Sequence, residues 1–150
     1  MKHYATLIEL QALVGQELGR SDWLQVSQER INQFAQATGD HQWIHIDPER
    51  AAAGPFGAPV AHGFLTLSLL PLLSETAFAV DDVRMGVNYG LNRVRFMSPV
   101  KVGSRVRAGF KLLSYEPLDG GAQLITRATI EVEGESKPAC VAESVSRRYR

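Results

Sequence analysis

The chain has 150 residues, a mass of 16.5 kDa, 16 basic and 16 acidic residues, and a formal net charge of zero. This length fits one domain, residues 1–150, that can bury a hydrophobic core without disulfides or a structural metal to stabilise it. The balanced charge argues against nucleic-acid or anionic-membrane partners, which need a basic surface. The single cysteine, Cys140, excludes an internal disulfide and a cysteine-cluster metal site.

The sequence shows no targeting or membrane-spanning segment. Glu9 and Gln11 interrupt the apolar residues near the N-terminus, so no signal-peptide core forms. The longest apolar run, residues 64–73, is much shorter than the roughly 20 residues that cross a bilayer. We therefore expect a cytoplasmic protein in a reducing compartment, and zero net charge mildly favours self-association.

The N-terminal part predicts short elements. Residues 4–19 suit a short helix or turn, because leucines at near-helical spacing are interrupted by glycines, and residues 21–26 suit a short strand. Ser27 can cap a helix. An i, i+3, i+4, i+7 stripe that starts at Ile31 predicts about three helical turns, which end at Gly39 in a left-handed cap.

A long irregular connection and an apolar segment follow. Residues 40–59 are rich in Pro, Gly and Ala, with one short helical turn at residues 47–50. Loops of this kind often carry function. Residues 62–79 form the most apolar segment and predict a helix that is buried nearly all round and bent in its middle by Pro71.

From Met85 onward, apolar residues recur at every second position. The alternation recurs in residues 92–96, 105–113, 124–132 and 139–145, with glycine turns between the runs. We predict an antiparallel meander of long strands. One buried helix followed by half-buried strands predicts an α+β fold in which a curved sheet wraps around that helix.

Two short motifs carry the candidate chemistry. Asp40 and His45 stand five residues apart in the irregular connection, and such a carboxylate and imidazole can hold and polarise one water molecule. His62 and Gly63 begin the apolar segment. Structural roles also remain open: Asp40 as a loop cap, His45 and His62 as buried structural histidines, and Gly63 as a helix-start glycine.

These motifs resemble a known family. The run Ala37-Thr38-Gly39-Asp40-x-x-x-Ile44-His45 is similar to the signature of MaoC-like, R-specific enoyl-CoA hydratases, and His62-Gly63 resembles their second marker. Gln42-Trp43 departs from the usual Asn-Pro, so the loop loses the rigid φ of proline and gains bulk. Likeness to the nodulation-protein-N-like subgroup, which includes mycobacterial hydratases, extends through residues 88–96, 99–103 and 137–143.

The resemblance implies a hot-dog fold and a lyase of fatty acid metabolism. Such an enzyme adds water to a 2-trans-enoyl-CoA to give the (R)-3-hydroxyacyl-CoA, and the reaction is reversible. Asp40 and His45 would be the catalytic pair, and the backbone N–H of Gly63 would meet the thioester oxygen. Further substrate-binding residues implied by the resemblance are His62, Asn88 and Arg93.

The same resemblance implies the partners. We expect a homodimer whose sheets join edge to edge, with an acyl-CoA tunnel near the interface. No metal is expected, and no cofactor beyond the coenzyme A of the substrate. Trp43 and the leucines of the apolar segment either line the tunnel or fill the core. Arg93 and Arg95 either meet the phosphates of coenzyme A or are ordinary exposed strand residues.

Two other functions remain open from the sequence. An acyl-CoA thioesterase can use the same fold with a carboxylate and a water, and would release a free thiol. A non-catalytic acyl-CoA-binding protein would bind its ligand equally well with Asp40→Ala. The spacing of Asp40 and His45 favours hydration over both.

Overall fold

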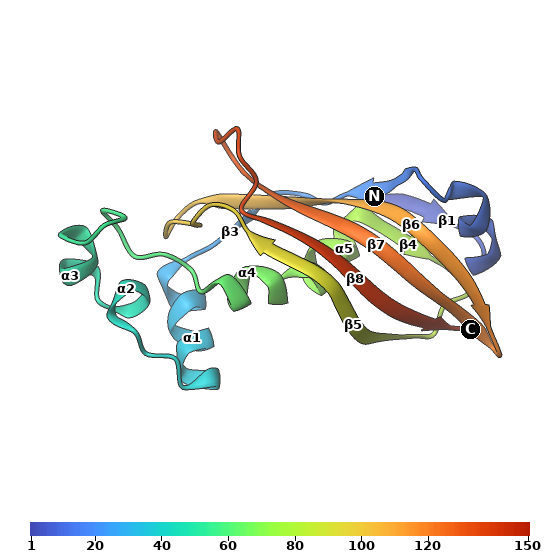
Figure 1. The fold of residues 1–150 in the computed structure, drawn as a ribbon, viewed down its shortest axis with the longest axis horizontal. Coiled ribbons are helices and arrows are strands. Elements are labelled where there is room, and N and C mark those ends of the chain that lie inside the picture. The colour runs from blue at the N-terminus through green and yellow to red at the C-terminus, as the bar shows by residue number, and fades with distance from the viewer.

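The computed structural model describes residues 1–150, whose helices and strands are arranged as shown in Figure 1. In chain order the elements are β1 (Lys2–Tyr4), the 3-10 helix η1 (Leu7–Leu13), β2 (Glu17–Arg20), β3 (Leu24–Gln25), α1 (Gln28–Thr38), α2 (Trp43–Ile46), α3 (Pro48–Ala52), α4 (Gly63–Ser68), α5 (Leu70–Ala77), β4 (Phe78–Val80), β5 (Met85–Phe96), β6 (Arg105–Leu118), β7 (Gly121–Val132) and β8 (Cys140–Tyr149).

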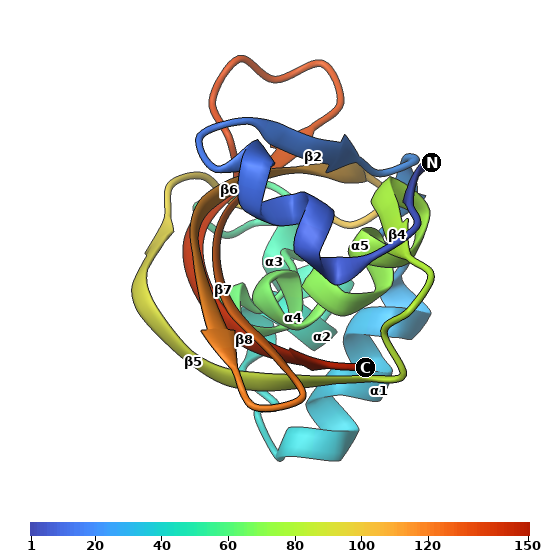
Figure 2. The ribbon, with the colours of Figure 1, turned by 90° about the vertical axis from the view of Figure 1, so that its right-hand side faces the viewer.

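The main sheet has six strands and curves around α4 and α5. Its order is β2-β6-β7-β8-β5, with β3 also paired to β6, and all the pairings are antiparallel. Figure 2 shows the long strands as an arc around the two helices. The predicted wrapped-helix arrangement is therefore confirmed. The larger core cluster contains 18 buried side chains, most of which come from α4, α5 and the inner face of the main sheet.

The predicted meander is only partly right. Strands β6, β7 and β8 are neighbours in sequence and in space, and Gly120 with φ 73° makes the predicted turn between the first two. Strand β5, however, pairs with β8 and lies at the edge of the sheet. Alternation in the sequence identifies a strand but not its partner, because pairing depends on contacts far along the chain.

Helix α1 matches its prediction because its ends are specified locally. The Ser27 hydroxyl accepts a hydrogen bond from the Arg30 N–H at 3.2 Å. At the other end Gly39 has φ 80°, and its N–H donates to the Ala35 carbonyl at 2.8 Å. This left-handed cap stops the helix and sends the chain into the site at Asp40.

The N-terminal prediction needs correction. The expected turn or short helix is present as η1, but residues 2–4 and 17–20 are strands, and β3 has only two residues. Strand β2 runs so close to α5 that a Cβ at Gly19 would lie 2.3 Å from the Ala77 carbonyl oxygen. The strand depends on this close approach and on pairing with β6, neither of which appears in the local sequence pattern.

The connection after α1 is more helical than predicted. The turn at residues 47–50 is confirmed as part of α3, where the Asp47 carboxylate accepts from the Arg50 N–H at 3.0 Å. One further helical turn, α2, precedes it and carries His45. Its four residues are too few to produce a periodic pattern in the sequence.

The central apolar segment is two helices, which corrects the prediction of one bent helix. The break falls at Leu69, and Pro71 sits in the first turn of α5, where its missing N–H costs no hydrogen bond. The segment is also not buried all round, because Phe64 is 68% exposed and Leu72 is 40% exposed. None of the helices combines the length with the apolar character that crossing a bilayer demands.

Candidate active site

Three side chains from separate segments meet at one end of the molecule. Asp40 follows α1, His45 lies in α2, and His62 directly precedes α4. One carboxylate oxygen and one ring nitrogen from each histidine all lie within 4.8 Å of one another. The structure therefore brings together the predicted pair, Asp40 and His45, and adds His62 to it.

The orientation of His45 is determined by the backbone beside it. Its Nδ1 lies 2.6 Å from the Val60 carbonyl oxygen, so Nδ1–H is the donor of this hydrogen bond. Val60 is itself held, because its N–H donates to the Ile44 carbonyl at 3.0 Å. In neutral His45 the other nitrogen, Nε2, therefore carries no proton and can accept one.

His62 supports both members of the pair. Its Nε2–H donates to the backbone carbonyl of Asp40 at 3.0 Å, which ties the start of α4 to the end of α1. Its ring stacks on His45 with centroids 3.8 Å apart, and Phe34 packs against it at 4.9 Å. His62 is only 2% exposed and its Nδ1 has no hydrogen-bond partner. These contacts give it a positioning role.

The surroundings of His45 favour its neutral form. Burial lowers its pKa from the usual 6.5, and a charge on the neighbouring His62 acts in the same direction. The Val60 carbonyl and the Asp40 carboxylate oppose this shift but come after burial in size. Asp40 is exposed, and its Oδ1 accepts from the Gln42 N–H at 3.3 Å. A proton acceptor and a carboxylate thus face the same small space.

Asp40, His45 and His62 are also of residue types that bind metal ions. Two of their groups are already engaged, since His45 Nδ1 bonds to Val60 and His62 Nε2 bonds to Asp40. The two rings are stacked with an interplanar angle of 23°. The nitrogen lone pairs of the two rings therefore lie in nearly parallel planes. Tetrahedral coordination requires the two lone pairs to converge on one metal ion, which this stacking does not favour. The arrangement suits a hydrogen-bonded water better, and the absence of a metal remains a prediction.

Gly63 begins α4 beside this cluster. Its N–H belongs to the first helical turn, which has no intrahelical acceptor, so it is available to a ligand. A Cβ at Gly63 would come within 3.1 to 3.2 Å of the Phe96 ring, so a larger residue here would require that ring to shift by a few tenths of an ångström. Because α4 has only six residues, the expected dipole support is smaller than a long helix would give.

The remaining predicted residues lie elsewhere. Asn88 and Arg93 are on β5, outside the cluster of Asp40, His45 and His62. Both side chains are exposed, but only Asn88 lines a cavity of about 600 Å³ between α4, α5 and the sheet. Trp43 does not line this cavity: it lies under the Arg50 guanidinium at 4.4 Å.

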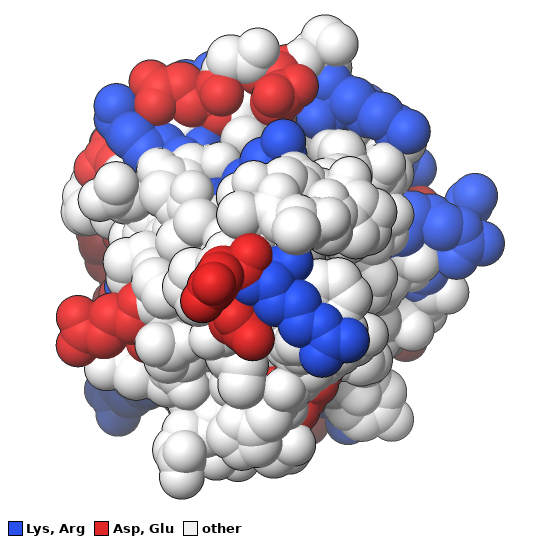
Figure 3. All heavy atoms as spheres, turned by 90° about the vertical axis from the view of Figure 1, so that its left-hand side faces the viewer, with Lys and Arg blue, Asp and Glu red and all other residues white.

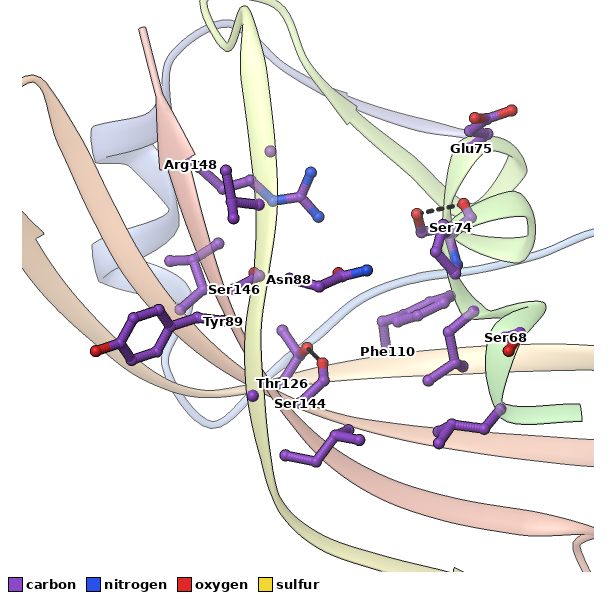
Figure 4. A pocket seen from close by; sticks show the side chains of 18 of the residues that line it. Ser68, Ser74, Glu75, Asn88, Tyr89, Phe110, Thr126, Ser144, Ser146 and Arg148 are labelled. Carbon is purple, nitrogen blue, oxygen red and sulfur yellow. Dashed lines mark hydrogen bonds between the residues drawn. The ribbon is translucent and has the colours of Figure 1, made fainter. Parts of the chain in front are cut away.

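The leucines of the central segment divide between the two predicted uses. Leu67 and Leu70 line the cavity, whereas Leu65 and Leu73 belong to the core without lining it. Figure 4 shows the cavity, with β5 crossing the middle of the view and the helical residues Ser68, Ser74 and Glu75 on the right.

Sequence reasoning missed the polar inner wall of this cavity. Thr126, Ser144, Ser146 and Arg148 project inward from β7 and β8 (Figure 4). Arg148 is the last inward-facing residue of β8 and lies mostly buried. The available signal was the period of two, which continues inward from Ala142 to Arg148.

The end of the molecule that carries α1, α2 and α3 shows both charge signs among a large uncharged area (Figure 3). Basic residues do not gather there into one broad surface. This face therefore gives no support to binding a polyanion, in agreement with the net charge of zero.

Comparison with known proteins agrees with the geometry. A family model described as MaoC like domain matches residues 9–133. The 3-hydroxyacyl-thioester dehydratase Z of Mycobacterium tuberculosis is 55% identical over 148 residues, 98% of each chain. Nodulation protein N of Rhizobium leguminosarum bv. viciae is 49% identical over 148 residues, 96% of this chain and 91% of the relative.

A solved structure agrees as well. The (R)-hydratase from A. caviae involved in PHA biosynthesis is 26% identical, with a TM-score of 0.71 over 89% of this chain and 94% of that chain. The predicted hot-dog architecture is thereby confirmed. On the family match, the near full-length relatives and the paired Asp40 and His45, this chain belongs to the MaoC-like domain family.

Proposed function

We propose that this protein is an (R)-specific enoyl-CoA hydratase, which adds water reversibly to a 2-trans-enoyl thioester. The observation that carries the proposal is the meeting of the Asp40 carboxylate with the free Nε2 of His45. The names of the relatives, a dehydratase and an R-hydratase, support the same reaction read in its two directions. Coenzyme A is the proposed carrier, and the cytoplasm is the proposed compartment.

The pair acts on one water molecule between its two members. One group accepts a proton from the water while the oxygen forms a bond to Cβ of the substrate. The electrons of the Cα–Cβ double bond move toward the thioester, whose oxygen gains negative charge as an enolate. A proton is then returned from the pair to Cα, so that one complete water is added and the pair recovers its original state.

Gly63 supplies the proposed oxyanion contact. Its N–H is free of intrahelical acceptors, and the thioester oxygen is the atom on which charge grows. A donor that meets the developing charge stabilises the transition state more than the ground state. Removal of one such donor in other enzymes costs about 2.7–4 kcal/mol.

The fall of kcat/KM toward acidic pH tests the protonation state of His45. Since burial lowers the pKa of His45 below 6.5, the imidazole stays neutral down to a lower pH than an exposed histidine would. We therefore expect kcat/KM to remain high at pH 6.5 and to fall only at lower pH, with an apparent pKa that belongs to the coupled pair. An acid limb centred above 6.5 would contradict this picture.

We also propose that two copies join through β5. This strand has twelve residues, lies at the sheet edge and exposes apolar side chains that include Met85, Val87 and Tyr89. A long, apolar, unpaired edge is a template for another strand and is normally covered.

A charge on β5 tests the dimer. Val87→Lys is expected to shift the mass in sedimentation from twice 16.5 kDa toward one chain, because lysine on an edge strand opposes strand pairing. Ile8→Lys, which adds the same charge at an exposed apolar position on η1, is the matched control and should leave the mass unchanged. A parent protein that sediments as a single chain at micromolar concentration would exclude this dimer.

Crotonyl-CoA tests the proposed reaction. We expect the absorbance of the enoyl thioester to fall without release of free thiol, and the product to be (R)-3-hydroxybutyryl-CoA. Thiol release in step with the absorbance change would identify a thioesterase instead. Unchanged absorbance with crotonyl-CoA and with longer enoyl-CoA substrates, despite measurable binding, would leave a non-catalytic acyl-CoA-binding protein.

A further inference from the structure

One arginine in the cavity between α5 and β5 has no partner. Arg148 lies on β8 with its guanidinium directed across the cavity (Figure 4), and no carboxylate or carbonyl of the chain bonds to it. Its neighbour Arg147 is satisfied on the opposite side of the strand, where Nε donates to Gln123 at 3.1 Å and the guanidinium lies over Tyr89. Four other arginines are paired with glutamates: Arg20, Arg105, Arg107 and Arg127.

The surrounding backbone leaves space for this guanidinium. A Cβ at Gly86 of β5 would lie 2.5 Å from Arg148 Nη1, so with any larger residue at this position the guanidinium would have to shift from where it lies under β5. Burial lowers the pKa of Arg148 through desolvation, with no compensating interaction. An arginine keeps its charge in proteins, so the cation is held in the cavity without an anion beside it.

The other polar groups narrow the choice of ligand. Four hydroxyls are already bonded within the protein: Thr126 with Ser144, Ser74 to a backbone carbonyl, and Ser68 to another. Ser146 and Asn88 on the sheet side remain free to donate beside Arg148. Glu75, the single carboxylate of the lining, is exposed at the outer turn of α5. The ligand that would satisfy Arg148 and these free donors is therefore a hydrogen-bond acceptor with negative charge.

The cavity begins where the proposed substrate would enter it. Leu67, its first helical residue, lies one turn beyond Gly63 on the same helix. From Gly63 to Ser74 the two helices advance about 16 Å at 1.5 Å per residue. An acyl chain that leaves the thioester at Gly63 and follows the apolar wall of Leu67, Leu70 and Phe110 thus leads toward Arg148.

From this geometry we propose that Arg148 binds a carboxylate at the far end of the acyl chain, so that the preferred substrates are enoyl thioesters of dicarboxylic acids. The proposal rests on the proposed function for the position of the thioester. It extends that function by naming the class of acyl group. Apolar walls hold the methylene chain, and Arg148, Ser146 and Asn88 bind the terminal carboxylate.

Calorimetric binding of saturated acyl-CoA thioesters tests this without any reaction. For chains of about eight to fourteen carbons, which bracket the span along the helices, we compare the ω-carboxylate with the methyl-ended chain of equal length. The parent should bind at least one ω-carboxylate about 10- to 100-fold more tightly, as expected for a hydrogen bond to a charged group. Equal or weaker binding at every length would overturn the proposal.

Variants then assign the preference to one residue. Arg148→Met should abolish it, Arg148→Lys should keep part of it, and Arg147→Met, the neighbouring control, should keep all of it. Because the charge of Arg148 is unpaired in the free protein, Arg148→Met should not lower the thermal midpoint. A preference that survives Arg148→Met, or a loss of the dimer in that variant, would overturn the proposal.

The two proposals fail in different ways. If neither crotonyl-CoA nor any longer 2-enoyl-CoA, the ω-carboxylates included, is hydrated, but the ω-carboxylate preference and its dependence on Arg148 are found, the reaction is wrong and the acyl-binding site stands. If crotonyl-CoA is hydrated and no preference is found, the reaction stands and the inference about Arg148 is wrong.

Discussion

Asp40→Asn is expected to lower kcat for hydration of crotonyl-CoA by about 10²- to 10⁴-fold, the usual contribution of a general acid or base. Asparagine keeps the shape of the side chain and an oxygen that can still accept from the Gln42 N–H. It removes the negative charge and the ability to take a proton. The loss should therefore appear in kcat, with little change in the far-UV circular dichroism.

The neighbouring His41 provides the control for this variant. It is exposed in the same loop and belongs to no contact of the Asp40, His45 and His62 cluster. His41→Gln should keep kcat within about twofold of the parent, as expected for a residue outside the catalytic group. A similar fall for both variants would mean that loop integrity, and not the Asp40 carboxylate, limits the rate.

Leu73→Ala is expected to lower the free energy of unfolding by about 2–5 kcal/mol, the usual cost of removing a buried leucine side chain. Leu73 is 2% exposed on α5 and packs in the core cluster that joins the helices to the sheet. The substitution removes apolar contact and leaves a cavity in the layer that supports the site. Urea unfolding followed by circular dichroism measures the change.

Leu72 is the matched control, since it is the same residue type on the same helix and is 40% exposed. Leu72→Ala should cost less than about 0.5 kcal/mol, the range of ordinary surface substitutions. The ratio of the two losses in free energy of unfolding reports which face of α5 meets the sheet. Equal losses would contradict the observed orientation of the helix.

Elements with local signals were predictable from the sequence. Helix α1 has a serine at one end and a glycine in the left-handed conformation at the other, and both act through hydrogen bonds within four residues. Strand β6 as far as Leu112, and most of β7, alternate buried and more exposed residues, because one face packs on the core. Their existence and their turn at Gly120 followed from these patterns.

Elements that depend on distant contacts were not predictable. Alternation did not show that β5 pairs with β8, because register and partner are chosen by the assembled sheet. Strand β2 is short and polar, and it exists because Gly19 allows close contact with α5. Pro71 indicated a disturbance in the central segment, but proline suits both a kink and a first helical turn, and the structure has the second.

The candidate site divides in the same way. The spacing of Asp40 and His45, together with the family resemblance, predicted that they would meet. The stacking of His62 on His45 required the start of α4 to return beside α1, which no local pattern encodes. Arg148 stands in a terminal run of basic residues, which is usually exposed, and only strand pairing directs it inward.

The most direct test of the account is a double-mutant cycle on the pair. It compares kcat/KM for crotonyl-CoA in the parent, Asp40→Asn, His45→Gln and the double variant. If both groups act on one water, each single variant should lose most of the activity and the double variant should lose little more, because the second group has no partner left to work with. Losses that multiply would mean that Asp40 and His45 act independently, and unchanged activity in the single variants would contradict the proposed site.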